Sequence, residues 1–290
     1  MDMIRFRSPA KLNLFLHITG RRPDGYHNLQ TLFQFIDYCD TLTFADTDET
    51  GPVQLAQDIP GVSTEQNLIF RAASLLKETT QCPLGATIGI NKVLPMGGGI
   101  GGGSSNAATT LVALNKLWQT HLPKEQLASL GLKLGADVPV FIQGRAAMAE
   151  GVGEKLTPID MDEPWYLLGI PDCHVETAAL FKDKYLTRNS NLITIRAALE
   201  GQGRNDFEPV ARRLFPAIDE AMRRFNAYGT AKLTGTGACV FCAFKDKQSA
   251  ELAKLSLDND ECIHPFKSIV VKGRNLSPLY QDLDTAKDSV

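Results

Sequence analysis

The chain has 290 residues, of which 43% are hydrophobic and 22% are charged, and its formal net charge is −3. A chain of this length can form two domains of ordinary size and bury roughly three quarters of its extended surface. The weakly acidic balance, without aromatic residues interleaved among Lys and Arg, excludes a nucleic-acid partner, and no apolar run is long enough to predict a membrane partner.

The N-terminal segment does not resemble a signal peptide, because Arg5, Arg7 and Lys11 interrupt its apolar residues. Six cysteines in a chain of this length do not form a disulfide framework, so we expect a cytoplasmic protein. Cys239 and Cys242 lie three apart in an apparent strand, where side chains alternate faces, and are expected in the core rather than at a metal or redox site. The sequence does not distinguish a monomer from a homodimer.

Residues 5–18 have a hydrophobic period of two and predict a strand. Lys11 and Asn13 project side by side from one face of this strand, either as ordinary residues of a solvated edge or as a polar pair in a site. Residues 22–25, Arg-Pro-Asp-Gly, then predict a turn, because Pro presets φ and Gly accepts positive φ. Tyr26 and His27 follow before a second predicted strand over residues 28–44.

An exposed aromatic ring beside an imidazole can stack on a planar ligand and hydrogen-bond to it. From these residues alone, however, a Tyr and a His that close a hairpin are the favoured interpretation. Residues 47–61 predict an acidic loop, and the capping-box spacing of residues 63–66 predicts the start of a helix that includes Leu68 and Leu76.

Six of the seven residues from Gly97 to Gly103 are glycine, between a strand predicted over residues 86–94 and a helix predicted over residues 107–118. Ser104, Ser105 or Asn106 can cap this helix. Glycines allow backbone N–H groups to approach a ligand closely, and the positive end of a helix dipole favours an anion. The stretch is therefore predicted to bind a chain of phosphates.

Three other interpretations of the glycine loop are weaker. A Walker-type loop needs Lys directly after the last glycine, where this chain has Ser104. A dinucleotide fingerprint needs a second strand carrying an acid about 20 residues further on, but residues 124–134 again predict a helix. A flexible linker would rarely join a strand to a capped helix.

Asp137 lies in an otherwise apolar run, Gly-Ala-Asp-Val-Pro, and is predicted to be functional because residues 138–142 do not resemble a helix that it could cap. Residues 144–157 are predicted to lead out of a first domain. Beyond them we predict a strand over 165–170, a turn at 171–172, helices over 177–185, 193–199, 209–225 and 249–257, a glycine turn into a strand over 233–240, a last edge strand over 267–271, and a loosely held tail after residue 275.

Three stretches together resemble the motifs of the GHMP kinases: residues 9–14 (Pro-Ala-Lys-Leu-Asn-Leu), 95–105 and 233–240. Within that family, residues 21–27, 67–69, 135–141 and 275–279 resemble the members that phosphorylate a cytidine diphosphate-linked methylerythritol, a step toward isoprenoid precursors by the non-mevalonate route. The resemblance covers nearly the whole chain.

The resemblance implies a two-domain α+β fold. A nucleotide domain similar to ribosomal protein S5 would span residues 1–157, and a ferredoxin-like α/β sandwich on the substrate side would span residues 158–290. It also implies ATP as the phosphoryl donor and Mg²⁺ as the cofactor, with Ser104 or Ser105 as possible metal contacts and no assigned ligand set.

The resemblance also implies roles for individual residues. Lys11 and Asp137 would be catalytic, and Asn13, Tyr26, His27, Thr177 and Phe181 would bind the substrate, with Tyr26 and Phe181 stacking on the cytosine and His27 reading its edge. The residues expected to bind ATP are Asn67, Pro95, Met96, Gly97, Gly98, Gly99, Ile100, Gly101, Gly102, Gly103, Ser104 and Ser105.

Three rivals remain at this point. Another GHMP kinase, for homoserine or mevalonate, would share the glycine loop, but Tyr26 and His27 would then have no base to bind. A nicotinamide-dependent oxidoreductase would use the loop for a dinucleotide. A non-catalytic module would bind ATP without turnover.

Overall fold

The computed structural model describes residues 3–259 and 263–285. The strands are β1 (Ile4–Arg21), β2 (His27–Ala45), β3 (Val53–Leu55), β4 (Ala86–Asn91), β5 (Ala147–Gly151), β6 (Lys155–Pro158), β7 (Trp165–Pro171), β8 (Lys232–Leu233), β9 (Val240–Phe244) and β10 (Phe266–Arg274). The helices are α1 (Leu68–Thr80), α2 (Gly102–Leu117), α3 (Lys124–Leu134), α4 (Val138–Gln143), α5 (Thr177–Lys182), α6 (Ile195–Leu199), α7 (Glu208–Leu214), α8 (Pro216–Phe225), α9 (Lys247–Asn259) and α10 (Pro278–Thr285).

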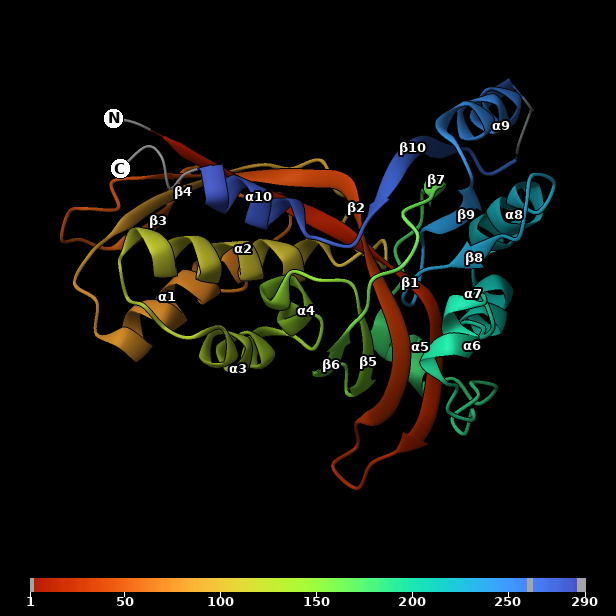
Figure 1. Ribbon diagram of the computed structural model, residues 1–290, viewed down its shortest axis with the longest axis horizontal. Helices are drawn as coiled ribbons and strands as arrows, with labels where there is room; N and C mark the ends of the chain where they lie inside the picture. Colours follow the sequence, from red (N-terminus) through yellow and green to blue (C-terminus); the bar gives the residue numbers. More distant parts are fainter. Residues whose placement is uncertain (1–2, 260–262, 286–290) are drawn as a thin grey trace.

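The strands of the described residues form one mixed sheet with the order β3-β4-β2-β10-β7-β9-β8, and β1 and the β5–β6 hairpin pair outside this path. Helices α1 to α4 and α10 lie in one half of the molecule, the first half, and α5 to α9 lie in the other, the second half (Figure 1). The long antiparallel strands β1 and β2 extend across both halves. The predicted strands over residues 5–18 and 28–44 are thus confirmed, and both are longer than expected.

The position of β10 differs from the prediction of an edge strand. Residues 266–272 pair with β7, and Gly273 and Arg274 pair with Ile36 and Phe35 of β2. β10 therefore lies between β2 and β7 and makes the strands of the two halves one continuous sheet. The local pattern shows that this segment is extended, but pairing across more than 200 residues of chain leaves no local signal.

A buried apolar cluster reinforces this joint between the halves. It contains Ala10, Leu12, Leu94, Ile100, Tyr166, Cys239 and Phe241, among others. Cys242 lies in a different cluster, which fills the second half. Both cysteines are fully buried, which confirms the core prediction, and burial raises the pKa of each thiol to about 12.

Local chemistry explains several other differences. The predicted capping box at residues 63–66 is wrong. The side chain of Asn67 accepts from the backbone N–H of Ile69 at 2.9 Å, so α1 begins about one turn later than that box would place it. The helix predicted over residues 209–225 is two helices, because Pro216 lacks an N–H and disfavours a helical conformation at Phe215. Residues 147–158 form the β5–β6 hairpin, which pairs with β2. The helix predicted over residues 124–134 is confirmed as α3.

Among residues 3–259 and 263–285, none of the helices combines the length and the apolar character that a membrane span needs.

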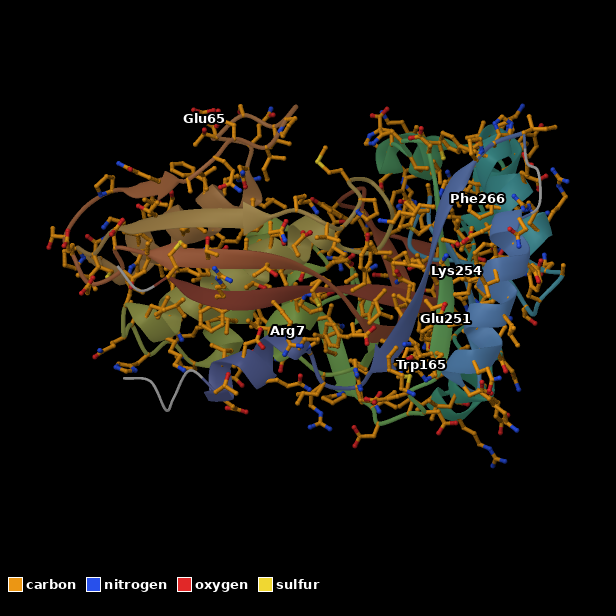
Figure 2. All side chains as sticks on the ribbon, turned by 90° about the horizontal axis from the view of Figure 1, so that it is seen from above. Arg7, Glu65, Trp165, Glu251, Lys254 and Phe266 are labelled. Atoms are coloured by element: carbon orange, nitrogen blue, oxygen red, sulfur yellow. The ribbon has the colours of Figure 1, made fainter. Side chains whose placement is uncertain are left out.

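The tail is not loosely held through residue 285, because it forms α10 against the first half. Arg7 of β1 lies beside α10 (Figure 2). The carboxylate of Asp282 accepts from the backbone N–H of Arg7 at 2.7 Å and from its guanidinium at 2.6 Å. Leu279 and Leu283 belong to the apolar cluster that fills the first half, together with Leu76 and Leu111. Residues 286–290 lie outside the described part of the chain.

We predict that Leu279→Ala lowers the free energy of unfolding by about 2–5 kcal/mol, because truncating a buried leucine leaves a cavity. Leu279 is 1% exposed, whereas Leu252 on α9 is 59% exposed. Leu252→Ala is therefore the control, with an expected change within about 0.5 kcal/mol. Equal effects in urea unfolding would contradict the docking of α10.

Candidate active site

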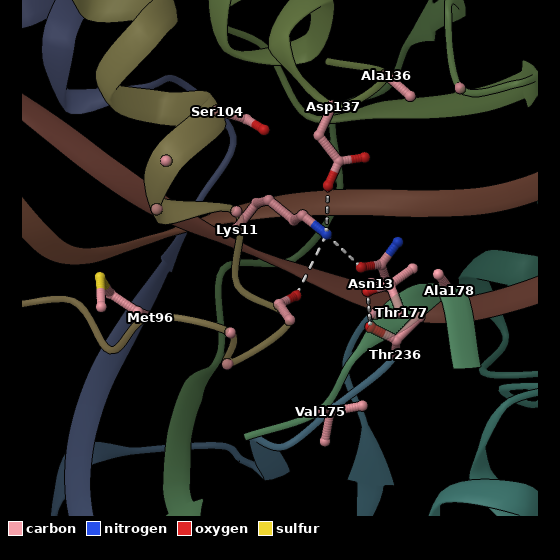
Figure 3. Close-up of a pocket in the computed structure, with 18 of the residues that line it drawn as sticks. Lys11, Asn13, Met96, Ser104, Ala136, Asp137, Val175, Thr177, Ala178 and Thr236 are labelled. Carbon is pink, nitrogen blue, oxygen red and sulfur yellow. Dashed lines mark hydrogen bonds and ion pairs between the residues drawn. The ribbon is translucent and has the colours of Figure 1, made fainter. Parts of the chain in front are cut away.

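A cavity of about 1150 Å³ opens where the two halves meet. It is lined by β1, the turn after it, the glycine loop, the residues before α4, α5 and the turn between β8 and β9, so segments from Lys11 to Thr236 converge there. Lys11, Asn13, Ser104, Asp137, Thr177 and Thr236 surround its centre (Figure 3). The ambiguity about Lys11 and Asn13 is thereby resolved, because both side chains face this cavity and neither belongs to a solvated edge.

The glycine loop makes backbone contacts that no side chain would permit. Gly99 has φ +73°, and a Cβ there would lie 2.3 Å from the carbonyl oxygen of Thr234. Gly101 has φ +75°, and a Cβ there would lie 2.8 Å from the ring of Phe141. α2 starts at Gly102 with Gly101 as its N-cap and no side-chain cap, so the prediction of Ser104, Ser105 or Asn106 as the cap is wrong.

The second glycine turn, residues 233–239, packs against the first. The backbone N–H of Cys239 donates to the carbonyl of Gly98 at 3.1 Å, and the hydroxyl of Thr234 donates to the carbonyl of Gly99 at 3.2 Å. Through these contacts the second half holds the shape of the loop. Thr236, from the same turn, hydrogen-bonds Thr177 at 2.9 Å across the cavity wall.

Lys11 is the central charge of the site, and its side chain is 3% exposed. Its ammonium lies 2.5 Å from Asn13 Oδ1, 3.2 Å from Asp137 Oδ2 and 3.3 Å from the carbonyl oxygen of Gly99. Three acceptors thus match the three donors of the group. The amide of Asn13 is itself fixed, because its Nδ2 donates to Thr31 at 2.8 Å.

Asp137 precedes α4, although residues 138–142 were not expected to be helical. Pro139 is compatible with this short helix because it lies in the first turn, where its missing N–H is not needed. The Asp137 carboxylate makes no capping hydrogen bond. It points to Lys11 and remains 36% exposed, so it is accessible from the cavity.

Aromatic rings form the other end of the cavity. The His27 ring is stacked on Phe181, with centroids 4.9 Å apart and an interplanar angle of 21°, and Phe207 meets Phe181 edge-on. Tyr26 is 66% exposed beside them. His27 Nε2 is buried and has no partner within the protein, and burial, with the charges of Arg188 and Arg21, lowers the pKa of His27.

Most of the predicted site residues line this cavity, but two do not. Ile100 is fully buried in the joint between the halves. Ser105 is also fully buried, and its hydroxyl is 2.9 Å from that of Ser8. Asn67 lines the cavity while its side chain caps α1, and Ser104 lines it near Asp137.

Several lining residues were not anticipated. Lys92 lies beside the start of α2 and pairs with the buried Asp40 at 2.8 Å. Arg21, Lys182 and Arg188 bring positive charge to the aromatic end. A Lys or Arg has the same local sequence pattern whether it faces solvent or a cleft, so no signal in the sequence separates these residues.

Comparison with known proteins agrees with this arrangement. Residues 67–145 match the GHMP kinases N terminal domain, and residues 183–264 match the GHMP kinases C terminal domain. The chain belongs to the GHMP kinase family. It is 52% identical to 4-diphosphocytidyl-2-C-methyl-D-erythritol kinase of Pseudomonas aeruginosa over 96% of both chains, and 51% identical to that of Marinobacter nauticus over 99% of this chain and 100% of the other. These relatives confirm the narrower resemblance.

Solved structures support the same two-domain α+β fold. A crystal structure of 4-(cytidine 5'-diphospho)-2C-methyl-D-erythritol kinase superposes with a TM-score of 0.80 and 32% identity, covering 93% of this chain and 100% of the other. A homoserine kinase from Cytophaga hutchinsonii has a TM-score of 0.65 at 16% identity over 96% of both chains. The latter shares the fold, and its low identity carries no further argument.

We predict that Gly99→Ala lowers the free energy of unfolding by at least about 2 kcal/mol, because a Cβ combines strain at positive φ with a backbone clash. Gly103 is the matched control. It lies within α2, and a Cβ there would meet only Leu68 at 3.4 Å. Thermal unfolding should show Gly103→Ala near or above the wild-type midpoint, and a tolerated Gly99→Ala would contradict the described loop.

Proposed function

We propose that this chain transfers the γ-phosphoryl group of ATP to a hydroxyl of 4-diphosphocytidyl-2-C-methyl-D-erythritol, with Lys11 and Asp137 as its catalytic residues. The observation that carries this proposal is the Lys11–Asp137 pair, 3.2 Å apart, between a glycine loop at a helix N-terminus and an aromatic pocket. Two relatives named for that activity align over 96% and 99% of the chain.

The phosphates of ATP would lie against residues 97–103, where the N-terminus of α2 favours negative charge. Lys11 and Lys92 also line the cavity beside this loop, near Gly101 and Gly102 respectively, where their ammonium groups would face the phosphates. Phosphoryl transfer depends mainly on positioning and charge neutralisation, and these groups supply both. Asn67 would contact the nucleotide from the start of α1.

The acceptor would lie between Asp137 and the aromatic end of the cavity. Asp137 would orient the attacking hydroxyl and accept its proton, while the nearby ammonium of Lys11 stabilises the developing charge. Asn13 would hold Lys11 in place and Thr177 would contact the polyol. Arg21, Lys182 and Arg188 are suited to the diphosphate of the substrate.

The cytosine would stack between Tyr26 and Phe181 and hydrogen-bond to His27. The unpartnered Nε2 of His27 supports this role, since a buried polar atom without a partner is costly unless a ligand satisfies it. In this structure the His27 ring itself is stacked on Phe181. A cytosine that stacks on Phe181 would therefore take the place of the imidazole, and His27 would move to the edge of the base.

Mg²⁺ is the proposed cofactor, and it would neutralise charge on the phosphates when bound. It commonly takes one or two protein ligands and completes its shell with phosphates and water. Ser104 and Asp137 fit such a sparse set, whereas Ser105 is committed to Ser8. No group of three or more His, Cys, Asp or Glu side chains suited to a metal occurs among the described residues.

The experiment that tests the function measures ADP release with Mg-ATP and four acceptors: the cytidine-bearing substrate, the same polyol phosphate without cytidine, homoserine and mevalonate. We expect turnover with the first alone. Turnover with another acceptor would reject the proposed base pocket. ATP binding without any turnover would favour a non-catalytic module, and NADH binding measured by fluorescence would favour an oxidoreductase.

We predict that Asp137→Asn and Lys11→Ala each lower kcat by about 10²–10³-fold while the KM for ATP changes by less than about threefold. The reason is that both groups act on the transferring phosphoryl group and the hydroxyl, and the nucleotide has many other contacts. Asp160→Asn, at a 74%-exposed side chain that pairs with Arg145, is the control. Near-wild-type kcat in either cleft variant would reject the pair.

The KM for the cytidine substrate should be constant from neutral pH down to about pH 6.5, the ordinary pKa of histidine, and should rise only at lower pH, where His27 becomes protonated. Its pKa is lowered, so the imidazole is neutral at pH 7 and can both donate and accept; protonation removes the acceptor and places a charge beside Arg188 and Arg21. His27→Ala should raise this KM at pH 7.5 and remove the pH dependence, without affecting the KM for ATP. His121→Ala serves as the control, and equal effects on both KM values would place His27 outside the substrate site.

A further inference from the structure

Asn205 is a buried amide that neither the cavity lining nor the proposed chemistry uses. It precedes α7 in the second half and is 4% exposed. Its Nδ2 donates to the carbonyls of Leu233, at 2.9 Å, and Gly235, at 2.7 Å, and its Oδ1 accepts from the backbone N–H of Phe207 at 3.0 Å. Both hydrogens of the amide are therefore used on either side of one residue, Thr234.

Thr234 is fully buried and connects the second glycine turn to β1, the strand that carries Lys11 and Asn13. Its hydroxyl accepts from the backbone N–H of Asn13 at 3.0 Å and donates to the carbonyl of Gly99 at 3.2 Å. Asn13 and Gly99 supply two of the three acceptors of the Lys11 ammonium. A displacement of Thr234 would therefore move both.

The segment around Asn205 also supports β1 directly. The register of β1 on β2 shifts between Asn13 and Leu16. Leu16 is paired with Thr31 of β2, and its backbone N–H also donates to the carbonyl of Arg204 at 3.0 Å while its carbonyl accepts from the N–H of Asp206 at 2.8 Å. The carboxylate of Asp206 accepts from the N–H of Ile18 at 2.7 Å. The segment thus pairs with β1 just beyond the residues that face the cavity.

We propose that Asn205 is a positioning residue for phosphoryl transfer. It holds Thr234 so that Asn13 and Gly99 orient the Lys11 ammonium toward Asp137. Phe207, whose N–H it accepts, packs edge-on against Phe181, so the same amide also fixes one wall of the aromatic pocket. This inference rests on the proposed function and adds a residue to it that touches no reactant.

We expect Asn205→Ala to lower kcat by about 10- to 100-fold with the KM for ATP within about threefold, because small misplacement of catalytic groups is costly. Asn115→Ala is the matched control. Asn115 also holds a loop with three hydrogen bonds, to Thr120 and to the N–H and carbonyl of Leu122, but lies outside the cavity. Both variants should lose stability, and only Asn205→Ala should lose kcat.

Thr234→Val and Thr234→Ser test the same connection if Asn205→Ala does not fold. The valine variant should lose kcat as Asn205→Ala does, and the serine variant, which keeps the hydroxyl, should recover most of it. In the double variant Asn205→Ala/Thr234→Val, kcat should lie within about threefold of the lower single variant, because both changes act through one contact.

Three results would overturn the role of Asn205: near-wild-type kcat in folded Asn205→Ala, wild-type kcat in Thr234→Val, or effects that multiply in the double variant. Turnover of the wild-type chain with the cytidine-bearing acceptor is measured alongside. If it occurs, any of these results rejects the role of Asn205 and leaves the proposed function intact. If it does not, the proposed function itself is rejected.

Discussion

The buried ammonium of Lys11 is the charge on which the rest of the cleft depends. An ionised amine removed from water costs several kcal/mol unless its hydrogen bonds and charge are compensated. Here compensation comes from β1 itself, from the glycine loop and from the residue before α4. The Coulomb attraction between unit charges about 4 Å apart is roughly 4 kcal/mol near a protein surface, and this attraction between Lys11 and Asp137, 3.2 Å apart, offsets part of the desolvation cost. Satisfying Lys11 therefore requires that these distant segments meet.

The joint between the two halves provides the rigidity that this arrangement needs. β10 continues the sheet from β2 to β7, and a shared apolar cluster includes Ile100 from the glycine loop itself. The second glycine turn fixes the first through backbone hydrogen bonds. The end of the cavity formed by the glycine loop is thus held by both halves, and such preorganisation is what electrostatic catalysis requires.

Chemistry differs between the two ends of the cavity. The glycine loop belongs to a fold that this chain shares with a homoserine kinase, at 16% identity, and with a mevalonate kinase, at 18% identity. The opposite end is built from Tyr26, His27, Phe181 and three basic residues, and we propose that it selects the acceptor. Function in such a family depends on the residues of the site rather than on the fold.

The sequence by itself determined the glycine loop, the strand that presents Lys11 and Asn13, and most helices, because glycine density and hydrophobic period are local properties. It also placed Asp137 among the functional candidates, although the helix after it was not foreseen. Tertiary structure alone decided that Ser105 and Ile100 turn away from the cavity, that β10 lies inside the sheet, that Lys92 lines the cavity, and that Asn205 hydrogen-bonds to the second glycine turn. These outcomes depend on which segments pair and pack across the whole chain, and such contacts leave no pattern in neighbouring residues.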